Sequence, residues 1–394
     1  MNRVRIADLA RPRFKANPYL FYARLRTEAP VCPARFLGRP AWLVTRYDDV
    51  LALLRDERVL KDWLPVTRWI HFVAGPVTRH MLNKDAPDHT RLRRLVHKAF
   101  APSLVARLRD RIQSVCDELL DELEAHGSMD LMSGYALPLP LMIIADLLGI
   151  PGEDRRRFHT RSRSTISPST VLGVLRAAPE QRLLARYIRK LVERRRREPR
   201  EDLVTALVQA EESGDRLSEK ELVAAIFFLL IAGYETTVNL IGVGALALMQ
   251  NPLERERFVQ DPAIASPAIE ELLRYTSPLD VATQRFAGED MTIASVRISR
   301  GDAIFAVLSS ANRDEAQFQN PDALNLMRDP NRHVAFGQGA HFCLGASLAR
   351  LDGHVALTTL FRRFPDLRPT CAPESLRWRR SLIVRGLKEL PVAV

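Results

Sequence analysis

Cysteine is scarce in this chain, which has four cysteines among 394 residues and no Cys-x-x-Cys pair. A disulfide framework and a structural zinc site are therefore not expected. Few, unpaired cysteines are typical of a reducing compartment. We accordingly expect the protein to be cytoplasmic.

The N-terminus lacks a continuous apolar segment, because charges interrupt "MNRVRIADLARPRFKANPYL" throughout. We expect neither a signal peptide nor a membrane anchor. The most apolar stretch, residues 222–249, is long enough to cross a membrane. Polar residues break its middle, however, at "YETT" and Asn239. The pattern favours a buried helix of a soluble protein and no membrane partner.

Acidic residues are outnumbered, with 47 Asp and Glu against 58 Lys and Arg and a formal net charge of +11. The basic residues cluster at residues 154–163 and 193–200. Such runs can bind nucleic acid or an acidic partner. Here they lie on segments with apolar residues at helical spacing, so we interpret them as solvated helix faces and expect no nucleic-acid partner.

Helical periodicity dominates the chain. Residues 42–45 read as a strand that leads into a helix at residues 47–54. Residues 88–123 are helical in pattern with a break near Pro102, and residues 141–250 are nearly all helical. Further short strands are predicted in residues 281–308 and 376–392. The fold class is therefore mainly α with a smaller β-rich part, and we expect a single domain over residues 1–394, because repeats and flexible linkers are absent.

One predicted helix is unusually long. Ser218 and Glu221 form a capping box at its start, and it is expected to end near Gln250, before an Asn-Pro pair. A helix of about 32 residues is roughly 48 Å long. An apolar helix of this length must cross the centre of the molecule.

The stretch "VAFGQGAHFCLGASLAR", residues 334–350, combines several glycines with one cysteine ahead of a predicted helix. Gly337, Gly339 and Gly345 indicate a tightly bent backbone or the close approach of a flat group. A helix N-terminus lowers the pKa of a nearby thiol and favours the thiolate. Cys343 is therefore a candidate metal ligand or nucleophile, and the glycine spacing favours this over an inert buried cysteine.

The ten residues "FGQGAHFCLG" resemble the haem-binding signature of the cytochrome P450 superfamily, with every fixed position filled. The resemblance implies the P450 fold of the soluble bacterial type, with the long central helix over haem b. It implies that Cys343 is the thiolate ligand of the iron, that Phe336 packs beside the sulfur and that His341 reaches a haem propionate. Gly337 and Gly345 belong to the same cofactor-binding loop.

A second motif, "AGYETT", lies in the middle of the long helix. Buried polar side chains need partners, and taken alone Thr236 could bond back to the carbonyl of Ala232 and kink the helix. The resemblance implies instead an acid–alcohol pair, in which Thr236 hydrogen-bonds dioxygen and Glu235 helps deliver protons. Ala232 and Gly233 would leave room over the iron.

The third motif is "EELLRY", in which Glu271 and Arg274 are neighbours on one helical face. Taken alone this spacing indicates an ordinary surface pair. The resemblance implies a structural pair that braces the loop before the cysteine. Glu270 offers another register, but its partner would be Leu273, which is not basic.

Further cations are candidates for the haem propionates, because arginine matches carboxylates bidentately. His89 and Arg93 are four residues apart on one helical face, and Arg285 lies in a predicted strand. Each alone would be read as a surface charge. The resemblance implies that these residues and His341 hold the propionates together.

The predicted function is that of a monooxygenase that inserts one oxygen atom of O2 into a mainly hydrophobic small molecule. A flavin or nicotinamide domain is not evident, so electrons would come from a separate ferredoxin and reductase. The predicted docking surface is basic and contains Arg91, Arg94, Lys98 and Arg350. A peroxide-driven peroxygenase and a haem-based gas sensor are the alternatives.

The substrate itself is not specified by the motifs. Its pocket is expected to be mainly apolar, so terpenoids, polyketides, fatty acids and steroids all remain open. The predicted walls include the loop at residues 62–78. The other predicted wall residues are Phe228, Ile231, Ala232, Leu279, Val281, Ala282 and Ile383.

Overall fold

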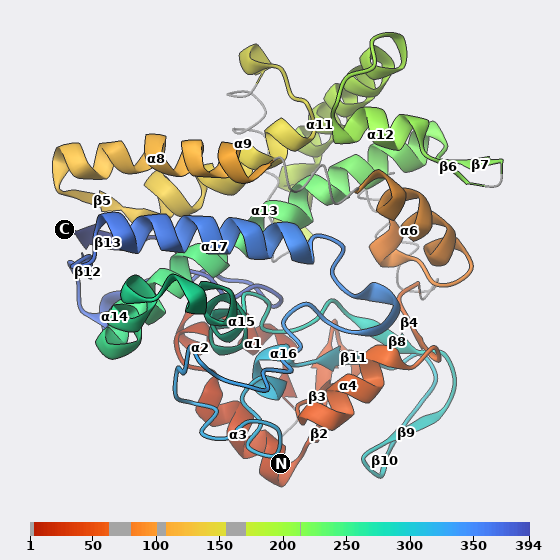
Figure 1. The fold of residues 1–394 in the computed structure, drawn as a ribbon. Helices are drawn as coiled ribbons and strands as arrows, with labels where there is room; N and C mark the ends of the chain where they lie inside the picture. The colour runs from red at the N-terminus through yellow and green to blue at the C-terminus, as the bar shows by residue number, and fades with distance from the viewer. Residues whose placement is uncertain (1–3, 63–79, 101–107, 155–170, 213) are drawn as a thin grey trace. The chain divides into compact units, whose positions relative to one another are not determined.

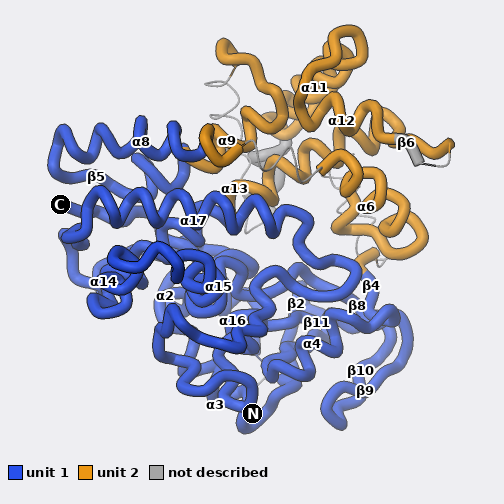
Figure 2. Tube along the Cα trace, in the orientation of Figure 1, with its two compact units in different colours: residues 1–60, 112–138, 236–394 blue, residues 61–111, 139–235 orange. Residues whose placement is uncertain are grey.

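The computed structural model describes residues 4–62, 80–100, 108–154, 171–212 and 214–394. The chain divides into two compact units, drawn in two colours in Figure 2. Unit 1 comprises Met1–Leu60, Ile112–Pro138 and Thr236–Val394, and unit 2 comprises Lys61–Arg111 and Leu139–Glu235. The expectation of one domain over residues 1–394 stays a prediction.

A mixed six-stranded sheet forms one part of unit 1 (Figure 1). Its strands, in spatial order, are β1 (Val4–Arg5), β2 (Val31–Phe36), β3 (Arg39–Val44), β11 (Ala303–Ala306), β8 (Arg285–Ala287) and β4 (Val59–Leu60). The hairpin between β2 and β3 turns at Leu37 and Gly38, both with positive φ. It leads into α4 (Tyr47–Arg55), which confirms the predicted strand and helix. Buried apolar side chains of the sheet and α4 form a shared core.

The remaining strands of unit 1 are short. They are β9 (Met291–Ile293) with β10 (Val296–Ile298), and β12 (Arg368–Pro369) with β13 (Pro391–Ala393) and β5 (Ser128–Asp130). The prediction of short strands over residues 376–392 is partly wrong. Apart from β13 this segment makes only isolated bridges, Trp378 with Leu387 and Val384 with Leu279. A close contact at Gly386, where an added Cβ would lie 1.8 Å from Asn239 Oδ1, limits the segment to an irregular path.

The helices of unit 1 carry the segments that lead to the cysteine loop. They are α1 (Ile6–Leu9), α2 (Pro12–Ala16), α3 (Tyr19–Glu28), α4, α14 (Pro252–Gln260), α15 (Ala265–Thr276), α16 (Leu308–Ala311) and α17 (Ala346–Arg363). Single turns of other helix types are η3 (Met132–Ala136), η4 (Pro262–Ile264), η5 (Gly339–His341) and η6 (Pro373–Ser375). The helix α17 lies beside α8 (Leu108–His126) (Figure 1), where Arg363 bonds Glu124.

Unit 2 is mostly helical. Its elements are η2 (Met81–Asn83), α6 (Asp88–Ala99), α11 (Val171–Arg197), α12 (Leu203–Gln209) and a hairpin of β6 (Glu211–Glu212) and β7 (Asp215–Arg216). Three helices contain residues of both units: α8, α9 (Pro138–Leu147) and α13 (Glu219–Gln250). The predicted break near Pro102 falls at residues 101–107, which lie outside the described residues, between the end of α6 and the start of α8.

The long helix α13 has the predicted boundaries. The backbone N–H and hydroxyl of Ser218 both donate to Glu221 Oε2 at 2.8 Å, which is the predicted capping box. By length and composition α13 could cross a membrane, and it is the one such helix among the described residues. Its most apolar window is 72% buried inside the protein, as a core helix is.

The basic run at residues 193–200 is not wholly a solvated helix face, and that prediction is wrong for Arg195. This side chain is 1% exposed, pairs with Asp202 and donates to the carbonyl of Gly149 at 2.6 Å. Gly149 has a φ of +65°, and a Cβ there would lie 2.1 Å from Asp202 Oδ2. Part of the positive charge of the chain is therefore balanced internally.

Candidate active site

The cysteine loop belongs to unit 1 and is a succession of tight turns. Gly337 and Gly339 have φ values of +69° and +72°, a region that favours glycine. The N–H of Cys343 donates to the carbonyl of Phe336 at 2.9 Å and so closes the loop. A Cβ at Gly339 would lie 2.5 Å from the carbonyl oxygen of Leu54. The glycine therefore lets the loop pack against the end of α4.

Cys343 presents an exposed thiol just ahead of a helix N-terminus. The residue is exposed, and α17 begins at Ala346 with Gly345 as its N-cap. A Cβ at Gly345 would meet nothing within 4 Å, and one at Gly337 would meet only a carbonyl oxygen at 3.9 Å. Packing among the described residues thus gives no steric reason for glycine at position 345. A flat group bound to an exposed thiol would need open space of this kind near the loop.

A cluster around Glu270 lies next to this loop. Arg350 Nε and Nη2 donate to the Glu270 carboxylate at 2.7 and 2.8 Å, and His333 Nε2 lies 3.1 Å from it. Burial acts to raise the pKa of Glu270, but the hydrogen bonds from Arg350 and His333 outweigh burial and lower the pKa to about 2. The carboxylate is therefore ionised at neutral pH and holds Arg350 in place.

Arg350 is thereby placed against the cysteine loop. Its guanidinium carbon lies 4.6 Å from the centre of the Phe336 ring. The pKa of Arg350 is raised first by its hydrogen bonds to Glu270 and also by the charge of Cys343. A fixed cation near the sulfur stabilises a thiolate. Sequence reasoning considered Glu270 only as an alternative to Glu271 and missed its pair with Arg350, because the two residues are 80 positions apart.

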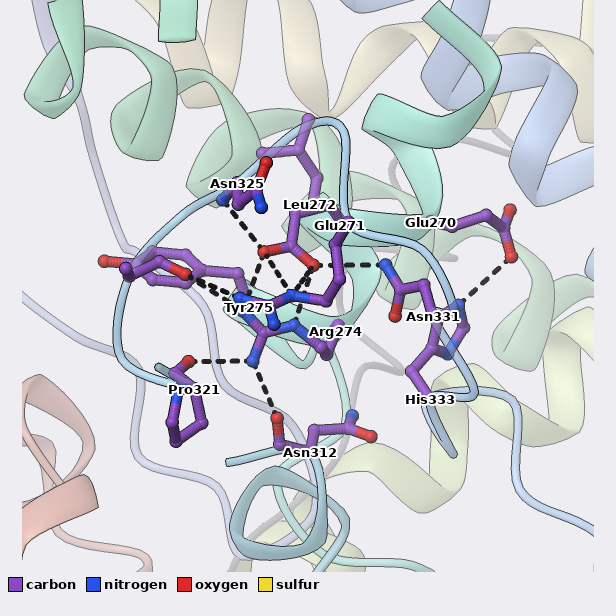
Figure 3. Close-up of polar contacts among 12 residues, drawn as sticks. Glu270, Glu271, Leu272, Arg274, Tyr275, Asn312, Pro321, Asn325, Asn331 and His333 are labelled. Carbon is purple, nitrogen blue, oxygen red and sulfur yellow. Dashed lines mark hydrogen bonds and ion pairs between the residues drawn. The ribbon is translucent and has the colours of Figure 1, made fainter. Parts of the chain in front are cut away.

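Glu271 and Arg274 on α15 form a buried, bidentate ion pair (Figure 3). Both side chains are 0% exposed, and the two N–O distances are 2.7 Å each. An ordinary surface pair is thereby excluded. Arg274 also donates to the carbonyls of Asn312 and Pro321 at 2.8 Å. An arginine so surrounded holds several turns of irregular chain at once.

The Glu271 carboxylate binds the same irregular segment from the other side (Figure 3). It accepts hydrogen bonds from the Asn325 N–H at 3.0 Å, from Arg328 Nε at 3.1 Å and from Asn331 Nδ2 at 3.1 Å. Asn312 Oδ1 then accepts the N–H of Val334 at 2.8 Å. Residues 312–334 are thus tied to α15 immediately before the cysteine loop begins.

The "AGYETT" motif lies within α13, which continues through it without interruption. Ala232 and Gly233 are exposed although most of their neighbours on the helix are buried. A Cβ at Gly233 would have Ile144 Cδ1, at 3.5 Å, as its one neighbour within 4 Å. Glu235 and Thr237 are 7% and 2% exposed, and Thr236 is half-buried. The two small residues therefore form an accessible patch on a helix that is otherwise mostly buried.

The four candidate propionate partners are divided between the units. In unit 2, His89 is 4% exposed and Arg93 is half-buried on α6, one turn apart. In unit 1, Arg285 is 6% exposed on β8 and His341 is half-buried on η5. His341 shares the loop of Cys343, so these two are close in the chain.

The predicted pocket walls differ in accessibility. Leu279, Ala282 and Ile383 in unit 1 are half-buried, whereas Val281 is 0% exposed and offers no accessible surface. In unit 2, Ile231 and Phe228 are half-buried, and the Phe228 ring stacks on that of His80 at 4.4 Å. Of the predicted loop at residues 62–78, residues 63–78 lie outside the described residues.

Arg91 and Arg350, which belong to the predicted docking surface, are engaged by carboxylates. Arg91 pairs with Glu221 and, at 3.2 Å, with Asp215, and Arg350 pairs with Glu270. Arg94 and Lys98 are exposed on α6. The positive charge available to a partner is therefore smaller than the sequence indicates.

The residues fit a haem better than a protein-bound metal ion. Over the described ranges, groups of three or more His, Cys, Asp and Glu that could hold a metal are not found. The exposed thiol, the nearby Arg350 and the open space at Gly345 agree with a haem at this loop.

Comparison with known proteins gives the family. The family model described as Cytochrome P450 matches residues 175–261 and 263–381. The chain is 46% identical over 398 residues to the polyketide biosynthesis cytochrome P450 PksS of Bacillus subtilis, covering 97% of this chain and 96% of that protein. It is 39% identical over 401 residues to 6-deoxyerythronolide B hydroxylase of Saccharopolyspora erythraea, covering 98% of each.

Solved structures agree. That of PksS matches with a TM-score of 0.92 at 45% identity and covers 98% of each chain. The myxobacterial cytochrome P450 CYP267B1, in complex with myristic acid, matches with a TM-score of 0.91 at 38% identity and covers 98% of each chain.

The fold and the comparisons together define a haem protein of the cytochrome P450 class. The chain belongs to the cytochrome P450 family. It is an enzyme, a cytochrome P450 monooxygenase. The predicted family and the predicted mainly α fold with a smaller β-rich part are confirmed.

Proposed function

We propose that this monooxygenase carries haem b and inserts one oxygen atom of O2 into a mainly hydrophobic small molecule. We also propose a cytoplasmic enzyme that takes electrons from a separate ferredoxin and reductase. The exposed thiol of Cys343, on a glycine loop ahead of α17 and beside Arg350, carries the proposal. When bound, haem supplies the binding and reductive activation of O2.

On the cysteine side, this chain would hold the sulfur as a thiolate. The N-terminus of α17 and the Arg350 guanidinium both favour negative charge at Cys343. Gly337 and Gly345 add no side chain to this loop, and a Cβ at Gly345 would meet open space. We assign His341, Arg285, His89 and Arg93 to the propionates, because cations and hydrogen-bond donors match carboxylates.

On the oxygen side, α13 would supply space and protons. Ala232 and Gly233 carry almost no side chain, and both are accessible on a buried helix. The Thr236 hydroxyl can donate a hydrogen bond to dioxygen, and the Glu235 carboxyl can carry a proton to that hydroxyl. This pair favours the use of dioxygen over peroxide.

The substrate class is inferred from the accessible apolar side chains Phe228, Ile231, Leu279, Ala282 and Ile383. Such walls favour an apolar ligand with few polar groups. The names of the relatives support this, since PksS belongs to polyketide biosynthesis and CYP267B1 binds myristic acid. We propose a polyketide-derived or fatty-acyl scaffold.

The test is the replacement Cys343→Ala. We expect it to abolish the thiolate-type absorption band of the reduced carbon monoxide complex, because the sulfur ligand is removed. Cys371→Ala, at a half-buried cysteine, is the matched control and should keep the band. Persistence of the band in Cys343→Ala would contradict the proposal.

A further inference from the structure

A buried ion pair in unit 1 joins two distant parts of the chain. Lys15 on α2 pairs with Asp280, which follows α15, and both side chains are 0% exposed. The two residues are 265 positions apart. Burial lowers the pKa of Lys15, and the nearby Asp280 charge opposes that shift. Because burying two charges is costly, such a pair calls for a reason beyond packing.

The Asp280 carboxylate is held by three donors from separate elements. The Lys15 ammonium and the Tyr22 hydroxyl donate to Oδ2, the latter at 3.2 Å. The Ser309 hydroxyl donates to Oδ1, and the Ser309 N–H donates to the Asp280 carbonyl at 3.1 Å. The backbone at residue 280 therefore has almost no freedom to shift.

The same lysine also holds the chain near residue 382. Lys15 Nζ donates to the Leu382 carbonyl at 2.9 Å. The N–H of Asp280 donates to the Ile383 carbonyl at 2.8 Å, and Leu279 forms an isolated antiparallel bridge with Val384. The Lys15 ammonium thus bonds to Asp280 and Leu382, one residue from each of the two segments that this single bridge joins. A single bridge is too short to fix the register of the two segments by itself.

Arg385 closes the arrangement from the other end. Its Nε donates to the Lys15 carbonyl at 3.0 Å, and its Nη2 donates to the Ala16 carbonyl at 3.3 Å. Its guanidinium carbon lies 4.0 Å from the centre of the Trp378 ring. The backbone of α2 is therefore tied to the segment that the Lys15 side chain also holds.

We infer that Lys15 is a positioning residue for substrate specificity, which fixes the register between residues 279–282 and 382–384. Leu279, Ala282 and Ile383 are the half-buried apolar side chains of these segments. The inference rests on the proposed function, because that proposal makes these side chains pocket walls. Small displacements of residues that place a substrate reduce its binding and reaction strongly.

The experiment compares Lys15→Met with the double variant Lys15→Met/Asp280→Asn in the haem-loaded enzyme. The single variant leaves the Asp280 charge buried without its cation, so it is expected to lose stability. The double variant removes both charges and should regain most of that stability. Both variants lose the bond to the Leu382 carbonyl, so both should lose the register of the two segments.

Two azoles that ligate haem iron serve as probes, clotrimazole as a bulky apolar one and imidazole as a small one. Their dissociation constants are read from the shift of the haem absorption band. For both variants we expect the clotrimazole constant to rise about tenfold or more while the imidazole constant stays within twofold. Amide hydrogen exchange at residues 279–282 and 382–384 should rise in parallel.

The matched control is Arg24→Met, which removes an exposed ion pair with Glu28 on α3 and should change neither constant. Unchanged clotrimazole binding in the double variant would overturn the inference, and so would an equal loss of both azoles. Absence of any band shift in the parent enzyme would instead overturn the proposed function. If Lys15→Met fails to fold, the double variant decides the question.

Discussion

At the scale of single residues, Asp352 on α17 is an unusual side chain outside the cysteine loop. It is 3% exposed, and its Oδ1 has no hydrogen-bond partner among the described residues. Burial raises its pKa from 3.8 to about 8. Cys116 is one of its neighbours. Burial raises the pKa of Cys116 to about 12, and the charge of Asp352 contributes to this shift.

This carboxyl predicts a pH-dependent stability. Its folded pKa lies above its unfolded value, so its contribution is fully present below about pH 4 and is lost as pH rises to about 8. Across that window the unfolding free energy should fall by up to about 1.4 kcal/mol per pH unit from this group. Asp352→Asn should remove this slope and be the more stable protein at pH 8.

The measurement is urea unfolding of both proteins at several pH values between 4.5 and 8. Asp366→Asn, at an exposed aspartate, is the control and should keep the parent's slope. Parallel curves for Asp352→Asn and the parent would show that Asp352 is ionised in the folded protein.

The glycines of the cysteine loop also matter as single residues. They differ in the atoms that an added side chain would contact. Gly339 avoids the Leu54 carbonyl, whereas a Cβ at Gly345 meets open space and the φ there is −87°. We predict that Gly339→Ala destabilises the protein by roughly 1–3 kcal/mol. Gly345→Ala should leave the stability of the haem-free protein unchanged but lower the haem content.

Haem content is measured by the pyridine haemochrome absorbance per mole of protein, and stability by thermal unfolding. A Gly345→Ala protein with full haem occupancy would contradict the placement of haem against this glycine.

At the scale of elements, α15 organises the segment before the cysteine through the Glu271–Arg274 pair. Arg274→Lys keeps the charge but cannot reproduce the bidentate pair or the bonds to the Asn312 and Pro321 carbonyls. We predict a loss of about 3–5 kcal/mol, as for a broken buried pair, and little haem-loaded protein.

Arg257→Lys is the control for that variant. Arg257 also pairs with a glutamate three residues away on a helix, Glu254, but its side chain is 61% exposed. Unfolding midpoints of the two variants should therefore differ by several degrees. Equal midpoints would show that the buried pair is no more important than the exposed one.

Element boundaries were largely predictable where a local signal exists. The capping box of Ser218 and Glu221 marks the start of α13, and alternation marks the strands β8–β11. The segment at residues 376–392 was not predictable, because its path depends on contacts with Asn239 and Pro278. Single bridges of this kind leave no periodicity in the sequence.

At the scale of the whole molecule, the net charge of +11 suggests attraction of an acidic electron donor. Arg94 and Lys98 are exposed on α6. We predict that Arg94→Glu with Lys98→Glu slows reduction by a ferredoxin about tenfold at low salt, with a smaller effect at high salt.

Stopped-flow reduction at several ionic strengths measures this effect. Arg24→Glu, a charge reversal on the exposed face of α3, is the control. A reduction rate that does not change with ionic strength in any of the three proteins would show that long-range charge attraction is not involved.

The sequence by itself determined the family and the class of enzyme, because the motifs that indicate them are short and each lies in one stretch of the chain. The cysteine loop is ten residues long and "AGYETT" is six. The conformation of such a short segment depends mainly on local backbone geometry. Residue types such as glycine indicate that geometry directly in the sequence. Their order along the chain was enough to indicate a haem-thiolate monooxygenase.

Only the tertiary structure decided which charged side chains are buried and which residues they pair with. Lys15 pairs with Asp280, which is 265 positions away, and Arg350 pairs with Glu270, which is 80 positions away. Arg195 lies in a basic run that we predicted to be solvated, but it is buried and pairs with Asp202. A charged residue looks the same in a sequence whether water or a carboxylate surrounds it. Its partner is chosen by the folding of distant segments against each other, because a buried charge is stable only when paired.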